Sequence, residues 1–270
     1  MRRVIQTIDD YDVGQLLGRG GFASVYRARE RSTCLLFAVK IMIKSYIEKH
    51  KMQSRVFNEI QIHSELNCEG IVKLHSHFED SEFVYLVLEL CEGGNLYQYL
   101  KSNGPLSETE ASSVISQLLT SLEYMHGQGV VHRDLKLSNI LLAQDNNQPS
   151  SSTHSLLGRG IKLCDFGLAI QVGHPDEVNC VIHAQQFMAS LLSRYLPKCA
   201  AFQLTVMCYI ECADFLFFFN QEHFTLCGTP NYIAPEIASQ RAHGFPADLW
   251  SVGCLFYSML TGMAADSRRK

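Results

Sequence analysis

The stretch "VVHRDLKLSNILL", residues 130–142, constrains this chain most, because it places charged and amide side chains between two apolar runs. Its polar members include His132, Arg133, Asp134, Lys136 and Asn139. Charged groups enclosed by apolar segments cost free energy unless they are paired or hydrogen-bonded. A fold that contains this stretch must therefore surround these groups with partners, or use them in a functional site.

Four further motifs accompany this stretch. In chain order they are "LLGRGGFASVYRA" at 16–28, "FAVK" at 37–40, "KLCDFGLA" at 162–169 and "TPNYIAPE" at 229–236. The third contains Asp165 and the last contains Glu236. Because five separate motifs occur in one order, we interpret them as parts of one site.

Gly18 and Gly20 lie in a turn between two strand-like segments, where glycine lets backbone amides approach a phosphate closely. As a Gly-x-Gly-x-x-Gly motif the segment is incomplete, because Ala23 stands at the last position. A strand rather than a helix follows the glycines, which disfavours a dinucleotide-binding site. Taken alone, the segment is equally consistent with an ordinary glycine-containing hairpin.

Lys40 lies in an apolar, strand-like run, where a lysine needs an anion such as nucleotide phosphates or a carboxylate. Glu59, on the helical segment that follows, is the candidate carboxylate. Taken alone, a lysine that extends its ammonium group into water and a solvated glutamate would explain these residues as well. The other motifs favour the paired interpretation.

The order of elements predicts an α+β fold in two parts. Residues 11–43 have the apolar, β-branched or alternating character of strands, and 52–66 have helical periodicity. The run 83–91 is typical of a buried strand, and the helical pattern that follows begins with Ser107 and Glu110 at capping-box spacing. We therefore expect a strand-rich N-terminal part and a helix-rich C-terminal part.

Charge and cysteine usage narrow the partners and the compartment. A net charge of −4 without a run of Lys and Arg argues against nucleic acid or an anionic membrane as the main partner. Ten cysteines stand at no regular spacing, and the first residues do not resemble a secretory signal. We therefore expect reduced thiols in an intracellular, cytoplasmic protein.

With these motifs the chain resembles eukaryotic protein kinases and, among them, the polo-like kinases. The second resemblance rests on Ala23 in place of the third glycine, on "FEDSEFVYLVLELCEGG" and on "TLCGTPNYIAPEIASQRAHGFPADLWSVGC". It covers residues 8–177 and 222–262 and implies a bilobal kinase fold. The implied parts are a leader at 1–10, an N-lobe with hinge at 11–91, a partial C-lobe at 92–262 lacking its last helices, and an atypical tail at 263–270.

The resemblance implies a reaction of ATP. Asp134 would orient a substrate hydroxyl and accept its proton, and Lys136 would offset charge on the transferring phosphoryl group. Lys40, positioned by Glu59, would hold the α and β phosphates. Function would then be phosphoryl transfer to protein serine and threonine hydroxyls.

The same resemblance implies the other nucleotide contacts. Asp165 would bind Mg²⁺, and Asn139 would bind a second Mg²⁺. The remaining ATP contacts would come from Leu17, Gly18, Arg19, Gly20, Gly21, Phe22, Ala23, Ser24, Val25, Ala38, Leu88, Glu89 and Cys91. Of these, Val25, Ala38 and Leu88 would lie against adenine, and the backbone from Glu89 to Cys91 would hydrogen-bond it.

The motifs that contain Lys136 and Thr229 resemble those of serine/threonine rather than tyrosine kinases. The resemblance places Thr229 in the loop that binds the substrate beyond its phosphorylated residue. Thr225 is the expected activation-loop phosphosite, because a phosphate there could pair with Arg133 and order the loop. The implied partners are protein substrates of the centriole or centrosome, in centriole duplication and cell-cycle control. The polo-box modules that target and dimerise this family are absent from the given chain.

Residues 178–221 depart from the family pattern, because removing them joins "QVGHPDE" to "EHFTLCGTPNY" as a continuous activation segment. The run "AAFQLTVMCYIECADFLFFF" contains Glu211 and Asp214, which disfavours a membrane span, and the cysteines lack the paired spacings of a zinc site. A regulatory insert would be expected to be more polar.

The codons at the two ends of this segment suggest another origin. Codons for Val178 begin with GT, and a phenylalanine run with pyrimidine-rich codons precedes Gln221, whose codon can be CAG. These are the sequence signals of an intron. We interpret the segment as a retained intron.

A second hypothesis is an inactive or misfolded kinase fragment that at most binds nucleotide. All catalytic residue types are present, so activity would be lost through the insert or through the missing part of the C-lobe. Glu236 would normally pair with an arginine from that part, and a buried carboxylate without a partner can cost about 3–5 kcal/mol. The polar loop at 144–160 is a further insertion with no functional interpretation.

Overall fold

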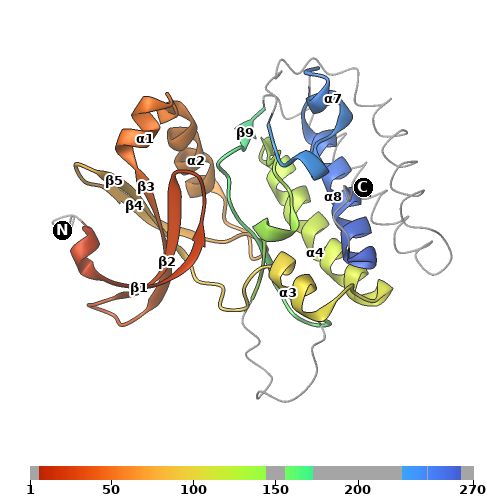
Figure 1. Cartoon of the computed structure of the whole chain (residues 1–270), viewed down its shortest axis with the longest axis horizontal. Coiled ribbons are helices and arrows are strands. Elements are labelled where there is room, and N and C mark those ends of the chain that lie inside the picture. The colour runs from red at the N-terminus through yellow and green to blue at the C-terminus, as the bar shows by residue number, and fades with distance from the viewer. Residues whose placement is uncertain (1–5, 144–155, 173–226, 242, 263–270) are drawn as a thin grey trace, which may run out of the picture. The chain divides into compact units, whose positions relative to one another are not determined.

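The computed structural model describes residues 6–143, 156–172, 227–241 and 243–262 (Figure 1). The chain divides into two compact units. The strand-rich unit comprises residues 1–67 and 71–91, and the helix-rich unit comprises residues 68–70 and 92–270. The predicted α+β fold, with strands first and helices later, is confirmed.

The strand-rich unit contains an antiparallel, five-stranded sheet with the order β1-β2-β3-β5-β4 (Figure 1). Its strands are β1 (Tyr11–Arg19), β2 (Ala23–Glu30), β3 (Leu36–Ile43), β4 (Leu74–Glu79) and β5 (Phe83–Glu89). A 3-10 turn, η1 (Ile8–Asp10), precedes β1, and the helices α1 (Lys44–Lys49) and α2 (Gln53–Glu65) connect β3 to β4. The strands within 11–43 and the helix within 52–66 therefore lie where the sequence predicts them.

Apolar side chains pack on both faces of this sheet, because side chains alternate along each strand. One cluster consists of Tyr11, Ala28, Val39, Tyr85 and Val87. The second cluster joins Met42 and Leu86 of the sheet to Ile47 of α1 and Val56 of α2. This second cluster fixes α2 against the sheet.

The helix-rich unit is built around two long helices, α4 (Glu108–Gly127) and α8 (Phe245–Thr261), which pack against each other. The other helices are α3 (Leu96–Asn103) and the short α7 (Pro235–Ala238), with 3-10 turns η2 (Leu137–Asn139) and η3 (Pro230–Tyr232). Short strands pair as β6 (Val130–Val131) with β9 (Ile170–Gln171), and β7 (Ile140–Leu142) with β8 (Ile161–Leu163). The two strand pairs bracket the motifs at 132–139 and 164–169.

The start of α4 has the predicted capping box. The Ser107 hydroxyl accepts the Glu110 backbone N–H at 3.3 Å, and the Glu110 carboxylate accepts the Ser107 N–H at 3.1 Å. Both bonds satisfy backbone donors that the helix itself cannot pair. They therefore fix the residue at which α4 begins.

The two predicted insertions fall largely outside the described residues. The polar loop at 144–160 connects the paired strands β7 and β8, and only its residues 156–160 are described. There Leu156 N–H donates to the Glu110 carboxylate at 3.1 Å. The whole segment 178–221 lies outside the described residues, as does the tail from 263 onward.

Candidate active site

The glycine segment forms the turn between β1 and β2. Gly20 N–H donates to the Ala23 carbonyl at 2.8 Å, and Gly18 is opposite Val25 across the two strands. A Cβ atom on Gly18 or Gly21 would meet no atom of the described chain within 4 Å. Internal packing therefore does not require glycine there, and the backbone is left open to a close external group.

Lys40 of β3 and Glu59 of α2 form an ion pair with an Nζ–Oε1 distance of 2.5 Å. Their side chains are only 11% and 3% exposed, so both charges are largely removed from water. Val56, three residues before Glu59 on the same helix, packs in the cluster that holds α2 to the sheet. The packing of this helix therefore directs the Glu59 carboxylate toward β3.

Three apolar residues expected to contact a nucleotide lie on the same face of the sheet as Lys40. Val25 is opposite Lys40, and Ala38 is opposite Leu88. Directly opposed residues of antiparallel strands share a face, as do residues two apart in one strand. Val25, Ala38 and Leu88 therefore form an apolar surface beside the Lys40 ammonium group.

The other expected nucleotide contacts lie at the ends of these strands. Leu17 of β1 is 42% exposed and Arg19 is the last residue of that strand. Phe22 is partly buried and stacks on Tyr46 with a ring-centroid distance of 5.9 Å. Glu89 is the last residue of β5, and the partly buried Cys91 follows it.

The loop between β6 and β7 brings the polar residues of the 130–142 stretch together around one carboxylate. Asp134 is 8% exposed, and its Oδ2 lies 2.5 Å from the Lys136 Nζ. Its Oδ1 accepts the Thr229 hydroxyl at 2.8 Å. Asn139 Nδ2 donates to the Asp134 carbonyl at 3.0 Å. Four residues predicted from two separate motifs thus meet within the helix-rich unit.

Asp248 of α8, which is fully buried, holds the backbone of this loop. Its Oδ2 accepts the His126 Nε2–H and the His132 backbone N–H, each at 2.9 Å, and its Oδ1 accepts the Arg133 N–H at 2.8 Å. Arg133 has φ +63°, a left-handed conformation that is strained for a non-glycine residue. The carboxylate therefore stabilises a backbone shape that the loop would not adopt by itself.

The pKa of Asp248 reflects this position. Burial by itself raises the pKa of the Asp248 carboxyl, but the hydrogen bond and charge of His126, with the charge and backbone N–H of His132, outweigh it. The net pKa lies below the ordinary value of 3.8, so Asp248 is ionised at neutral pH. The negative charge strengthens its hydrogen bonds to the loop.

Asp165 follows β8, is exposed and has φ +67°. The adjacent Cys164 N–H donates to the Asn139 carbonyl at 3.0 Å, and the His132 Nε2 donates to the Cys164 carbonyl at 3.2 Å. Phe166 is fully buried and packs edge-on against the His132 ring at 5.3 Å. These contacts bring the two predicted metal-binding residues, Asn139 and Asp165, onto adjoining backbone segments.

The oxygen donors at this place fit Mg²⁺. Among the described residues, no group of three or more His, Cys, Asp or Glu side chains is arranged so that it could hold a metal ion by itself. Mg²⁺ takes oxygen ligands and is usually bound by one or two carboxylates together with substrate phosphates. One carboxylate, from Asp165, and one amide oxygen, from Asn139, suit that pattern.

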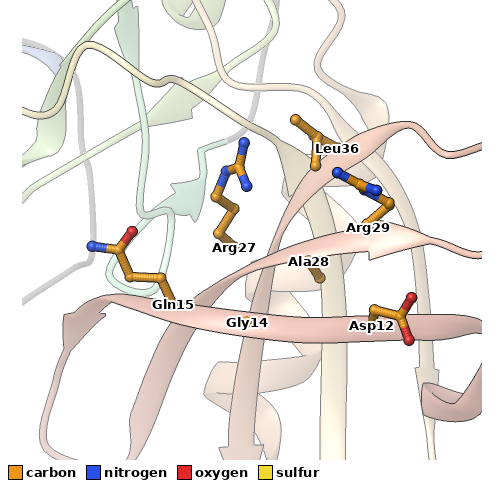
Figure 2. Close-up of a pocket in the computed structure, with 7 residues that line it drawn as sticks. All are labelled: Asp12, Gly14, Gln15, Arg27, Ala28, Arg29 and Leu36. Carbon is orange, nitrogen blue, oxygen red and sulfur yellow. The ribbon is translucent and has the colours of Figure 1, made fainter.

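A separate pocket of about 210 Å³ lies on the strand-rich unit (Figure 2). Its lining residues are Asp12, Gly14, Gln15, Arg27, Ala28, Arg29 and Leu36. At its rim Asp12 is paired with Arg31 at 2.9 Å, and both side chains are more than half exposed. No predicted site residue lines this pocket, and sequence patterns did not indicate it.

Of the two threonines predicted as site residues, Thr229 is described. Thr225, the expected phosphosite, lies outside the described residues.

Among the described helices, none has both the length and the apolar character needed to cross a bilayer.

The sequence matches the protein kinase domain family over residues 11–224 and 218–268. The chain belongs to the protein kinase domain family. This confirms the kinase prediction made from the motifs.

Two relatives show where in the kinase family the similarity lies. The chain is 38% identical over 259 residues to the serine/threonine-protein kinase PLK4 of Drosophila grimshawi, covering 95% of this chain and 26% of the relative. It is 38% identical over 255 residues to PLK4 of Xenopus laevis, covering 94% of this chain and 21% of the relative. The predicted resemblance to polo-like kinases is therefore confirmed, and the chain spans about a quarter of the length of these curated relatives.

Proposed function

We propose that the chain is an ATP-dependent protein kinase that transfers the γ-phosphoryl group to serine and threonine hydroxyls. One observation supports this most: the buried Asp134 carboxylate lies between the Lys136 ammonium group and the Thr229 hydroxyl. The carboxylate accepts a threonine hydroxyl at 2.8 Å, which is the contact a general base makes with an acceptor hydroxyl. The same contact would be available to a substrate serine or threonine.

In this proposal Asp134 orients the acceptor hydroxyl and takes its proton. Lys136 Nζ, 2.5 Å from the Asp134 carboxylate, carries a positive charge beside the reacting atoms and offsets negative charge on the group being transferred. Asn139 Nδ2 donates to the Asp134 carbonyl at 3.0 Å and so helps to fix the loop. Thr229 belongs to the surface that binds the substrate beyond its phosphorylated residue.

The strand-rich unit would bind the nucleotide. The Lys40 ammonium group, fixed by Glu59, would hold the α and β phosphates, and the segment from Gly18 to Val25 would cover them with backbone amides. The apolar surface of Val25, Ala38 and Leu88 suits a planar base. Backbone groups from Glu89 to Cys91 would complete the recognition of adenine.

Asn139 and Asp165 would hold Mg²⁺. When bound, the ion would neutralise charge on the phosphate oxygens. The chain's own contribution is to keep these two residues on adjoining segments through the Cys164–Asn139 backbone bond.

For the substrates and the setting, the proposal rests on similarity to the relatives. Because the chain is similar to PLK4, we expect the protein to act on centriolar or centrosomal proteins in centriole duplication, within the cytoplasm. Thr225 would be its activation-loop phosphosite, with Arg133 as the partner of the phosphate.

A test separates this kinase from a fragment that only binds nucleotide. Wild-type chain, Asp134→Asn and the surface control Asp12→Asn are incubated with Mg²⁺ and γ-labelled ATP and a casein acceptor, and nucleotide binding is followed by thermal shift. We expect transfer by the wild type and by Asp12→Asn, and a loss of about 10²–10⁴-fold in Asp134→Asn. A nucleotide-dependent thermal shift without transfer by the wild type would favour the inactive fragment.

A further inference from the structure

The segment from His243 to Asp248 holds Arg133 at two points. Asp248 Oδ1 accepts the Arg133 backbone N–H at 2.8 Å, and His243 Nε2 lies 3.3 Å from the Arg133 Nη1. His243 is only 3% exposed and stands just before α8, the helix that carries Asp248. Backbone and side chain of one loop residue are thus fixed by the same short stretch.

The contacts of His243 define its protonation state. A guanidinium group can only donate, so the His243 Nε2 must accept from Arg133 and carries no proton. The His243 Nδ1 lies 3.1 Å from the Arg241 carbonyl, which can only accept, so Nδ1 carries the proton. The arrangement therefore requires a neutral imidazole with its proton on Nδ1.

The same guanidinium group of Arg133 also reaches the segment that carries Asp165. Arg133 Nε donates to the Leu168 carbonyl at 2.8 Å, three residues after Asp165. The Arg133 carbonyl lies close to Gly228, where a Cβ atom would be 2.8 Å from it. Arg133 thus connects the loop of Asp134 to residues on both sides of the segment 173–226.

We propose that His243 is a positioning residue for phosphoryl transfer: its neutral imidazole accepts a hydrogen bond from Arg133 and so holds that side chain on the Leu168 carbonyl. The inference rests on the proposed kinase function, because the group it positions adjoins Asp134. His243 touches neither nucleotide nor substrate in this proposal. It acts through Arg133.

Protonation of His243 would break the arrangement. An imidazolium has no acceptor nitrogen, and it would place a second positive charge 3.3 Å from the guanidinium. Charged or titratable groups on the described segments that contact His243 or Arg133 include Arg241, Asp248 with its partners His126 and His132, and Asp134 and Lys136 of the loop that carries Arg133. The negative charge of Asp248 is engaged by His126 and by two backbone donors, and Arg133 is a cation in direct contact with His243.

Two substitutions of His243 distinguish acceptance of the Arg133 hydrogen bond from simple filling of space by the side chain. His243→Gln places an amide oxygen near the position of Nε2 and keeps an acceptor for Arg133, without a titrating proton. His243→Asn reaches only the position of Nδ1, so it keeps a donor for the Arg241 carbonyl and loses the acceptor. At pH 8 we expect kcat to fall about 10–100-fold in His243→Asn, the effect of losing one hydrogen bond to a charged group, with most of it restored in His243→Gln.

The pH profile provides a readout that a purely structural role would not change. In the wild type, kcat should fall on the acid side as His243 becomes protonated, and this limb should be absent in His243→Gln. His50→Asn, a substitution of an exposed histidine on the other unit, is the matched control and should keep the wild-type limb. Equal kcat values for wild type and both His243 variants across pH 5.5–8.5 would overturn the proposal, as would equal losses in Asn and Gln.

A second measurement does not depend on catalysis. Thermal unfolding of wild type, His243→Asn, Arg133→Met and the double variant forms a double-mutant cycle, and we expect the two single effects to be strongly non-additive. Additive effects would show that the two side chains do not interact and would refute the contact. If the wild type transfers no phosphate, the proposed function fails, whereas the cycle still decides whether His243 holds Arg133. If His243→Asn does not fold, the comparison of His243→Gln with wild type across pH decides the inference.

Discussion

Replacement of Asp248 by asparagine tests how the loop around Asp134 is held. The change keeps shape and volume but leaves one acceptor oxygen where two carboxylate oxygens receive three donors. Whichever way the amide turns, at least one buried N–H faces an NH₂ group and loses its partner. Losing one charge-assisted hydrogen bond and leaving a buried donor unsatisfied should cost about 3–5 kcal/mol.

The assay is thermal unfolding at pH 7, where about 2–4 °C per kcal/mol gives an expected fall in Tm of about 6–20 °C. The pH dependence has a defined sign. Because the folded pKa of Asp248 lies below 3.8, its contribution is present above that pH and is lost as the pH falls through the folded value. The difference in Tm between wild type and Asp248→Asn should therefore narrow only below about pH 3.8.

Asp12→Asn is the matched control for Asp248→Asn. Asp12 is also paired, with Arg31 at 2.9 Å, but its side chain is 61% exposed, so its loss should cost less than about 1 kcal/mol. A Tm for Asp248→Asn within about 2 °C of wild type would refute the idea that this carboxylate holds the loop.

Three further changes test other parts of the structure. Glu59→Gln should lower kcat/KM for ATP about 10–100-fold, because Lys40 loses its charged partner; unchanged ATP kinetics would argue against the pair. Gly228→Ala should destabilise the chain by about 1–3 kcal/mol in urea unfolding, since φ is +99° and the new Cβ would lie 2.8 Å from the Arg133 carbonyl; an unchanged midpoint would contradict this. Ser107→Ala should cost about 0.5–2 kcal/mol by removing the cap of α4, and restoration by Ser107→Thr would identify the hydroxyl as the cause.

Several features of this chain could be predicted because a few neighbouring residues are enough to indicate each of them. Ser107 and Glu110 are three residues apart, and their capping box needs no other part of the chain. The strand-forming segments within 11–43 are separated by glycines and polar turn residues that lie beside them in the sequence. The contact between Lys40 and Glu59 could also be anticipated, because a lysine in an apolar strand needs a nearby anion.

The positions of His126 and His243 could not be predicted in the same way. His126 lies 122 residues from Asp248, and His243 lies 110 residues from Arg133. In the sequence, His126 looks like an ordinary residue near a helix end, and His243 like part of a loop. Their roles depend on the packing of α4 and α8, which determines which polar groups are buried together.

The most direct test of the central claim is phosphoamino-acid analysis of casein after incubation with the wild-type chain, Mg²⁺ and γ-labelled ATP. The arrangement of Asp134, Lys136 and Thr229 predicts label on phosphoserine and phosphothreonine, reduced by about 10²–10⁴-fold in Asp134→Asn. Absence of label with the folded wild-type chain, or equal labelling by Asp134→Asn, would contradict the claim.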